Sequence, residues 1–131
     1  MSNISDFNTA ANAQTDHEHE VQLSMLQALC TAVRQKRDVE SVAQMLDQLT
    51  LYCEAHFMSE ELLMRQKSYD EYAEHVDDHS HMLNLLKDMA TDHAAGHSPL
   101  VAGTTEEVLA FISNHIATRD KRFAYFLRSG Q

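Results

Sequence analysis

The sequence has few residues that interrupt helices. Among 131 residues it contains three glycines, one proline and no tryptophan. Glycine and proline disfavour helix interiors and mark most turns, so their scarcity argues against a fold of many short strands. The segment 93–103, which contains Gly96, Pro99 and Gly103, is predicted to be a loop. The chain is expected to be all-α.

The sequence also lacks the signatures of membrane and secretory proteins. No apolar run approaches the ~18–20 residues that cross a bilayer. The polar segment 1–15 has neither a basic region nor an apolar stretch, so no signal peptide is predicted and a cytoplasmic location is expected. Two cysteines, Cys30 and Cys53, are too few for a disulfide framework and are expected to be buried thiols.

Positive charge is scarce as well. Ten Lys and Arg face twenty Asp and Glu, which gives a net charge of −10. Nucleic-acid binding depends on cationic side chains that neutralise phosphates, so a nucleic-acid partner is not expected. The same charge argues against an anionic membrane surface as a partner.

What the chain has instead is helical patterning. Capping-box sequences, in which Ser or Thr precedes Glu by three residues, begin at Thr15, Ser68 and Thr104, and Asp38 is a suitable N-cap. Each of these positions is followed by apolar residues at helical spacing. With 44% apolar residues, the chain can form one core and one domain spanning 1–131.

These signals predict an antiparallel up-down four-helix bundle with an extended N-terminal arm. The arm is expected to cover 1–15. The helices are expected at about 16–37, 39–67, 69–92 and 104–128.

Nine histidines are the unusual feature of the composition. The pair His75 and His79 alone is weak evidence, because chance often gives such spacing in a histidine-rich chain. His56 and Glu60, however, share a helix face one turn apart. An imidazole or carboxylate on an apolar face is costly unless it is paired or bound to a metal. Several imidazoles and carboxylates lie on predicted core faces, including His115, and this favours a metal site.

Helix direction provides an independent test of a metal site. In an up-down bundle, the starts of the first and third helices meet the ends of the second and fourth. The candidates that fall towards this one end are His19, His56, Glu60, His75, His79, His115 and Asp120. His115 and Asp120 are five residues apart, about 140° around an ideal helix. A local π-type distortion or a difference in side-chain reach could bring them together.

Five imidazoles and two carboxylates exceed the four ligands of one zinc ion. The set suits two six-coordinate ions with bridging carboxylates, and mixed nitrogen and oxygen donors favour iron or manganese over calcium or magnesium. A ferritin-like site would use Glu-x-x-His on two helices. No Glu in this sequence has a His three residues later, so that site is disfavoured.

The ordered pattern resembles the ligand pattern of the hemerythrins in their bacterial form, over about 16–127. It reads His19, His56-x-x-x-Glu60, His75-x-x-x-His79 and His115-x-x-x-x-Asp120. The chain departs from that family in two places. It lacks an N-terminal tryptophan, and Glu18 stands where the family often has glutamine.

The resemblance implies two iron ions joined by an oxo or hydroxo bridge. It implies that the ligands divide as His75, His79 and His115 on one iron, His19 and His56 on the other, and Glu60 and Asp120 on both. One position on the second iron would stay open for molecular oxygen, and nitric oxide would compete for it. The remaining histidines are expected to lie outside the site: His17, His81, His93 and His97.

Three functional hypotheses remain from the sequence. The first is an oxygen carrier or storage protein, and the second is a redox or oxygen sensor that acts on a signalling output domain or partner. A C-terminal output domain in the full-length gene product would favour the sensor. The third, an oxidase or peroxidase, ranks lowest because the sequence suggests no substrate cleft.

Overall fold

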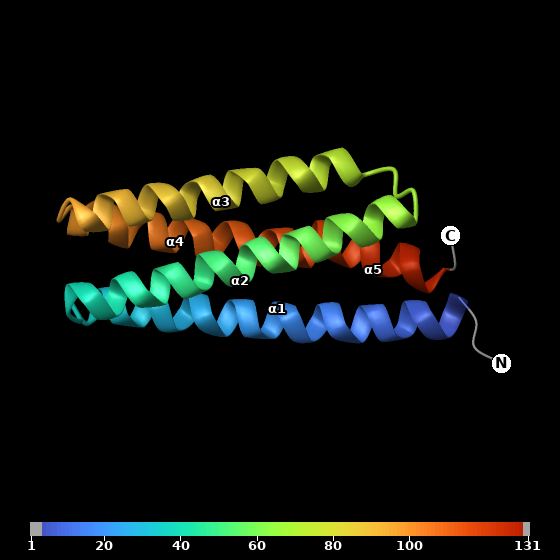
Figure 1. The fold of residues 1–131 in the computed structure, drawn as a ribbon, viewed down its shortest axis with the longest axis horizontal. Coiled ribbons are helices and arrows are strands. Elements are labelled where there is room, and N and C mark those ends of the chain that lie inside the picture. Colours follow the sequence, from blue (N-terminus) through green and yellow to red (C-terminus); the bar gives the residue numbers. More distant parts are fainter. Residues whose placement is uncertain (1–3, 130–131) are drawn as a thin grey trace.

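The computed structural model describes the backbone of residues 4–129, with side chains described for 12–97 and 101–129. Its elements are α1 (Ile4–Arg34), α2 (Val39–Gln66), α3 (Tyr72–Ala94), α4 (Ser98–His115), the π-helix η1 (Ile116–Asp120) and α5 (Lys121–Arg128). The last three form one nearly continuous rod. Contacts run from α1 to α2, α2 to α3, α3 to α4 and α4 to α1, which gives the predicted antiparallel four-helix bundle (Figure 1).

Helix α1 begins earlier than predicted. The residues expected as an extended arm instead continue the helix back to Ile4, and residues 1–3 lie outside the described part. The segment before Thr15 contains no glycine or proline and is rich in alanine, so nothing in it stops a helix. The Asn12 side chain donates to the carbonyl oxygen of Ala124 at 3.2 Å and so links this part of α1 to α5.

The other boundaries differ for local reasons. Ser68 has a φ of 53°, so it cannot start a helix, and α3 begins at Tyr72 rather than at 69. Helix α4 begins at Ser98 rather than at 104, because Pro99 occupies the first turn, where its missing N–H costs nothing. The predicted loop is therefore only a short turn around Gly96, whose φ is 80°. Asp38 caps α2 as predicted, since its side chain accepts from the Ser41 amide at 3.2 Å.

Two apolar clusters fill the described part of the bundle. The larger contains Leu29, Leu49, Leu86 and Ile112 and occupies the half where α1 ends and α2 begins. The smaller consists of Met64, Tyr69, Phe123 and Leu127 and closes the other end. Along α2 the clusters stop at Phe57 and resume at Met64, so the polar residues between them are shielded from water on both sides.

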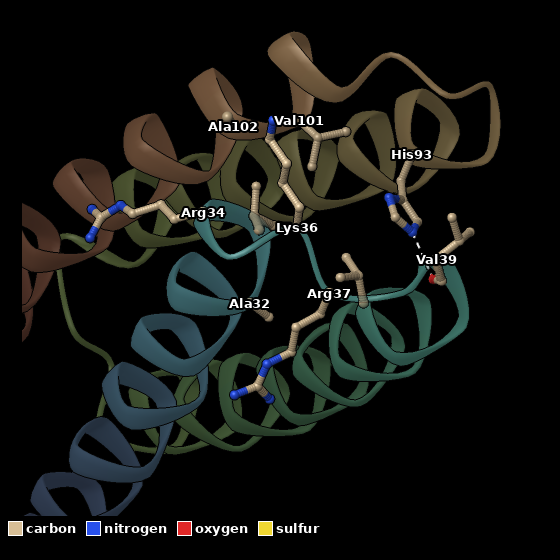
Figure 2. Close-up of a pocket in the computed structure, with 10 residues that line it drawn as sticks. Ala32, Arg34, Lys36, Arg37, Val39, His93, Val101 and Ala102 are labelled. Atoms are coloured by element: carbon tan, nitrogen blue, oxygen red, sulfur yellow. Dashed lines mark hydrogen bonds between the residues drawn. The ribbon is translucent and has the colours of Figure 1, made fainter.

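The end of the bundle farthest from these polar residues contains a cavity of about 570 Å³ (Figure 2). Part of it is lined by Arg34 at the end of α1, by Lys36 and Arg37 in the α1–α2 turn, and by His93. A ring nitrogen of His93 hydrogen-bonds the carbonyl oxygen of Val39 at 2.8 Å and ties α3 to the start of α2. No helix in the described range is both long and apolar enough to cross a membrane.

Candidate metal centre

The structure brings all seven predicted ligand residues together in the buried gap between the apolar clusters. Each of these residues is at most 7% exposed. They come from four helices and the π-helix: His19 from α1, His56 and Glu60 from α2, His75 and His79 from α3, His115 from α4 and Asp120 from η1. Because α1 begins at Ile4, about four helical turns precede His19, and it lies well inside the bundle.

The donor atoms form two overlapping groups. Glu60, His79, His115 and Asp120 can place one ligand atom each within 4.8 Å of one another, and His19, His56 and Glu60 form a second such group. Glu60 belongs to both groups. The Nε2 atom of His75 lies 3.7 Å from Asp120 Oδ1, which places His75 beside the first group. Two groups with a shared carboxylate are what a two-ion site requires.

Glu60 divides its two oxygens between these groups. Its Oε1 lies 3.1 Å from His79 Nε2, whereas its Oε2 lies 3.6 Å from His56 Nε2 and 3.7 Å from His19 Nε2. One carboxylate therefore faces both sides of the centre at once, as a bridging ligand does.

Asp120 divides its oxygens in the same way. Its Oδ1 lies 3.1 Å from His115 Nε2, and its Oδ2 lies 3.0 Å from His19 Nε2. Since His115 and His19 belong to different groups, Asp120 is the second carboxylate placed to bridge.

The π-helix explains how two residues five apart reach one site. Residues Ile116–Asp120 form a single π turn, so His115 and Asp120 point to the same side. Of the two explanations for the five-residue spacing, the π-type distortion is therefore confirmed. On an undistorted helix, Arg119 would have taken the position below His115; here its Nε lies 2.7 Å from Asp78 Oδ2 in α3 instead.

Nine buried atoms of the centre form no hydrogen bond of standard geometry, although the Nε2 atoms of His19, His79 and His115 each face a carboxylate oxygen at 3.0–3.1 Å. The nine are the Nε2 atoms of all five histidines, both oxygens of Glu60, Oδ1 of Asp120 and Nδ1 of His75. A buried polar atom without a partner costs about 1–3 kcal/mol, and buried polar groups are almost always satisfied in native proteins. Cations bound among these nitrogen and oxygen donors would satisfy them, so the residues present fit a metal centre.

The electrostatics of the metal-free centre are dominated by its two carboxylates. Burial lowers the pKa of His19, but the facing Asp120 and Glu60 outweigh it and raise that pKa to about 9. Burial raises the pKa of Asp120, yet His115 and His19 hold it well below its usual range. Without a metal, the centre therefore holds at least one proton near neutral pH. Metal binding must release that proton and is favoured as the pH rises.

Three of the histidines donate through Nδ1 to carboxylates that sequence reasoning missed. The pairs are His56 with Glu18 at 2.6 Å, His79 with Glu61 at 2.7 Å and His115 with Asp78 at 2.9 Å. An ionised carboxylate can only accept, so each ring carries its proton on Nδ1 and leaves Nε2 free for a metal. Each carboxylate comes directly before or after a ligand residue in the sequence, which is the one signal that could have found them.

The walls of the centre are aromatic and apolar. The Phe57 ring stacks on His79 with centroids 4.0 Å apart and planes 6° from parallel. On the surface side, a cavity of about 90 Å³ reaches His56 and Glu60 between Thr15, Glu18 and Ser59. In the part of the chain that the structure describes, a small cavity thus lies between the surface and the His56 side of the centre.

The four remaining histidines lie outside the cluster. His17 and His81 are exposed, and His97 is exposed in the turn after α3. His93 is half-buried at the far end of α3, where it binds Val39. Their placement agrees with the division made from the sequence.

The two cysteines are packed thiols, and both should resist modification in the folded protein. Cys53 is 1% exposed, its Sγ accepts from Gln22 Nε2 at 3.1 Å, and burial raises its pKa to about 11. Cys30 is 4% exposed and burial raises its pKa as well. At pH 8 a disulfide reagent should modify neither thiol until urea unfolds the chain, and then both. Fast modification of Cys53 in the folded state would contradict this packing.

Comparison with known proteins agrees with the geometry. Residues 11–127 match the profile of the Hemerythrin HHE cation binding domain. The bacteriohemerythrin of Aquifex aeolicus (strain VF5) is 30% identical over 115 residues, covering 86% of this chain and 87% of that protein. The bacteriohemerythrin of Methylococcus capsulatus (strain ATCC 33009 / NCIMB 11132 / Bath) is 30% identical over 109 residues, covering 82% of each. No solved structure matches significantly. The chain therefore belongs to the hemerythrin HHE cation-binding domain family.

Proposed function

We propose that this chain holds two iron ions joined by an oxo or hydroxo bridge and binds molecular oxygen at one of them. The observation that carries the proposal is the division of the Glu60 and Asp120 oxygens between two histidine groups. The proposed ligands are His75, His79 and His115 for one iron, His19 and His56 for the other, and Glu60 and Asp120 for both. Membership of the hemerythrin family supports iron as the metal.

The proposed donor count leaves one coordination position for oxygen. Three imidazoles, two carboxylates and a solvent-derived bridge would fill six positions on the first iron. Two imidazoles, two carboxylates and the bridge would fill five positions on the second iron and leave one open. The cavity of about 90 Å³ beside His56 and Glu60 opens next to this second group. Nitric oxide, a diatomic molecule of similar size, is expected to compete for the same place.

The protein orients the ligand side chains of this centre and excludes water from it. When bound, a reduced iron pair supplies the two electrons that oxygen binding requires. Glu18, Glu61 and Asp78 hold three imidazoles with Nε2 turned inward. Phe57 and the two apolar clusters exclude water, which limits the proton supply that would release reduced oxygen species.

The size of the opening favours a binding protein over an enzyme. Pockets for organic ligands usually measure about 300–1,000 Å³, whereas this cavity measures about 90 Å³. A cavity of this size suits a diatomic molecule better than a larger organic substrate. We propose oxygen storage, transport or sensing as the role; a sensor would pass the change at the centre to an output domain or partner.

Oxygen titration of the reduced protein tests this function. The iron-loaded chain is reduced without oxygen, titrated with oxygen and followed by visible absorbance, and oxygen is then removed under argon. We expect an absorption band that saturates at one oxygen per chain and is lost on deoxygenation. Zinc-loaded protein, which cannot be oxidised, serves as control and should not respond. Immediate irreversible oxidation would contradict a carrier, and no response at all would contradict oxygen binding.

A further inference from the structure

We propose that Arg119 is a positioning residue for the metal centre, which acts through Asp78 to set the orientation and donor strength of His115. This inference rests on the proposed function, because it assigns His115 to one of the two irons. In the part of the chain that the structure describes, Arg119 forms its ion pairs with Asp78 and Glu71 and not with a proposed metal-donor atom. The structure supports it through one continuous chain of contacts from the surface to the centre.

The contact chain has two short links that meet at a single oxygen. Asp78 Oδ2 accepts from His115 Nδ1 at 2.9 Å and lies 2.7 Å from Arg119 Nε. The Asp78 side chain is 23% exposed and that of Arg119 is 32% exposed, so both are partly withdrawn from water. Since imidazole and guanidinium share this oxygen, the arginine competes directly for the electron density that Asp78 offers to His115.

The corresponding pair at His56 is built differently. Glu18 Oε1 accepts from His56 at 2.6 Å, and its other oxygen accepts from the neutral amide of Gln14 at 2.7 Å. The second partner of Glu18 thus carries no charge and uses a separate oxygen. A carboxylate that accepts from Nδ1 strengthens the Nε2 atom as a metal ligand. His56 is therefore expected to be the stronger donor and His115 the weaker one.

The π-helix makes this arrangement possible. Within one five-residue turn it turns Asp120 inward beside His115 and sends Arg119 outward to Asp78 in α3. Arg119 also approaches Glu71 at 3.8 Å, and Arg122 contacts the same Glu71 oxygen at 2.8 Å. Arg122 lies in the same network but, in the described part of the chain, forms its ion pair with Glu71 and not with Asp78.

This difference between the arginines provides a matched test. Arg119→Gln and Arg122→Gln remove the same charge from neighbouring positions, but only the first frees Asp78. A freed Asp78 should make His115 a stronger donor and favour ferric over ferrous iron. We expect Arg119→Gln to raise the ferric-to-ferrous affinity ratio about tenfold, a shift of about 59 mV to more negative potential for one electron. The potential of Arg122→Gln should remain close to that of wild type. Arg119→Lys should show a smaller shift than Arg119→Gln, because lysine supplies the charge without the guanidinium geometry.

The experiment is an anaerobic redox titration of iron-loaded proteins, followed by visible absorbance, after iron content and thermal melting confirm loading and folding. The set includes Asp78→Asn and the double variant Asp78→Asn/Arg119→Gln. In the Asp78→Asn background, the Arg119 substitution should have no further effect, because the connecting carboxylate is gone.

Two results would overturn the inference alone: equal shifts for the two arginine variants, or an Arg119 effect that persists without Asp78. A wild-type chain that does not hold two irons would instead overturn the proposed function and this inference with it. The iron content of wild-type protein therefore separates the two failures. An Arg119→Gln chain that fails to fold leaves Arg119→Lys as the deciding comparison, and a wild-type potential there would count against a role for the guanidinium geometry.

Discussion

His115→Ala is expected to abolish one of two metal-binding steps, whereas His93→Ala leaves both intact. The His115 side chain is 2% exposed, and its Nε2 lies 3.1 Å from Asp120 Oδ1 in the centre. Its loss removes one of the three imidazoles proposed for the first iron, together with the contact between that imidazole and Asp120. His93 lies at the opposite end of α3, where its ring hydrogen-bonds the backbone carbonyl of Val39.

Cobalt(II) titration of the metal-free proteins measures this directly, because cobalt accepts the same donors and its visible bands report coordination. Wild type and His93→Ala should saturate at two cobalt ions per chain. His115→Ala should saturate at one or bind the second at least tenfold more weakly. Identical titrations for both variants would show that the ligand boundary has been drawn wrongly.

Removal of the metal is expected to destabilise the bundle strongly. The nine unpartnered donor atoms cost free energy in the metal-free protein, and bound ions would recover it. With free metal at about 1,000 times its dissociation constant, binding adds about 4 kcal/mol to the free energy of unfolding. Thermal melting followed by circular dichroism should therefore show a markedly lower midpoint after chelation, which reloading reverses.

The loss of stability on removal of the metal should depend on pH. The pKa of His19 is about 9 in the folded metal-free protein, against an ordinary value of 6.5. Protonation of His19 thus stabilises the metal-free fold fully below about pH 6.5, and this stabilisation is lost as the pH rises towards 9. The gap between loaded and metal-free melting midpoints should widen over that range. Asp120→Asn removes a carboxylate that is proposed to bridge the two ions, so its melting should depend little on metal. Equal melting of loaded and chelated wild type would contradict this prediction.

The bundle could be predicted from the sequence because apolar residues recur at helical spacing along the chain. The spacing of apolar residues gave four helices, and the α2 cap at Asp38 was found at its correct place. Helix starts were less predictable, because a capping-box sequence is compatible with a helix interior. Thr15 lies inside α1, which continues for lack of any breaker before it. Pro99 suggested a loop but lies in the first turn of α4.

The candidate site could be predicted because helix direction sorts its residues to one end of the bundle. The structure places six of them in two groups of possible ligands and His75 beside the first group, although metal binding by them stays a prediction. The outer carboxylates could not be predicted in the same way. Asp78 precedes His79 in sequence but serves His115 on another helix. That pairing depends on how α3 and α4 are rotated against each other and on the π turn that sends Arg119 to α3, neither of which follows from spacing.

The number of iron ions per chain tests the central claim most directly. Protein produced in iron-rich medium and freed of loosely bound metal can be analysed for iron and zinc, with chain concentration taken from amino-acid analysis. Two carboxylates that each face two histidine groups predict two irons per chain. One metal ion per chain, or zinc in place of iron, would contradict the account.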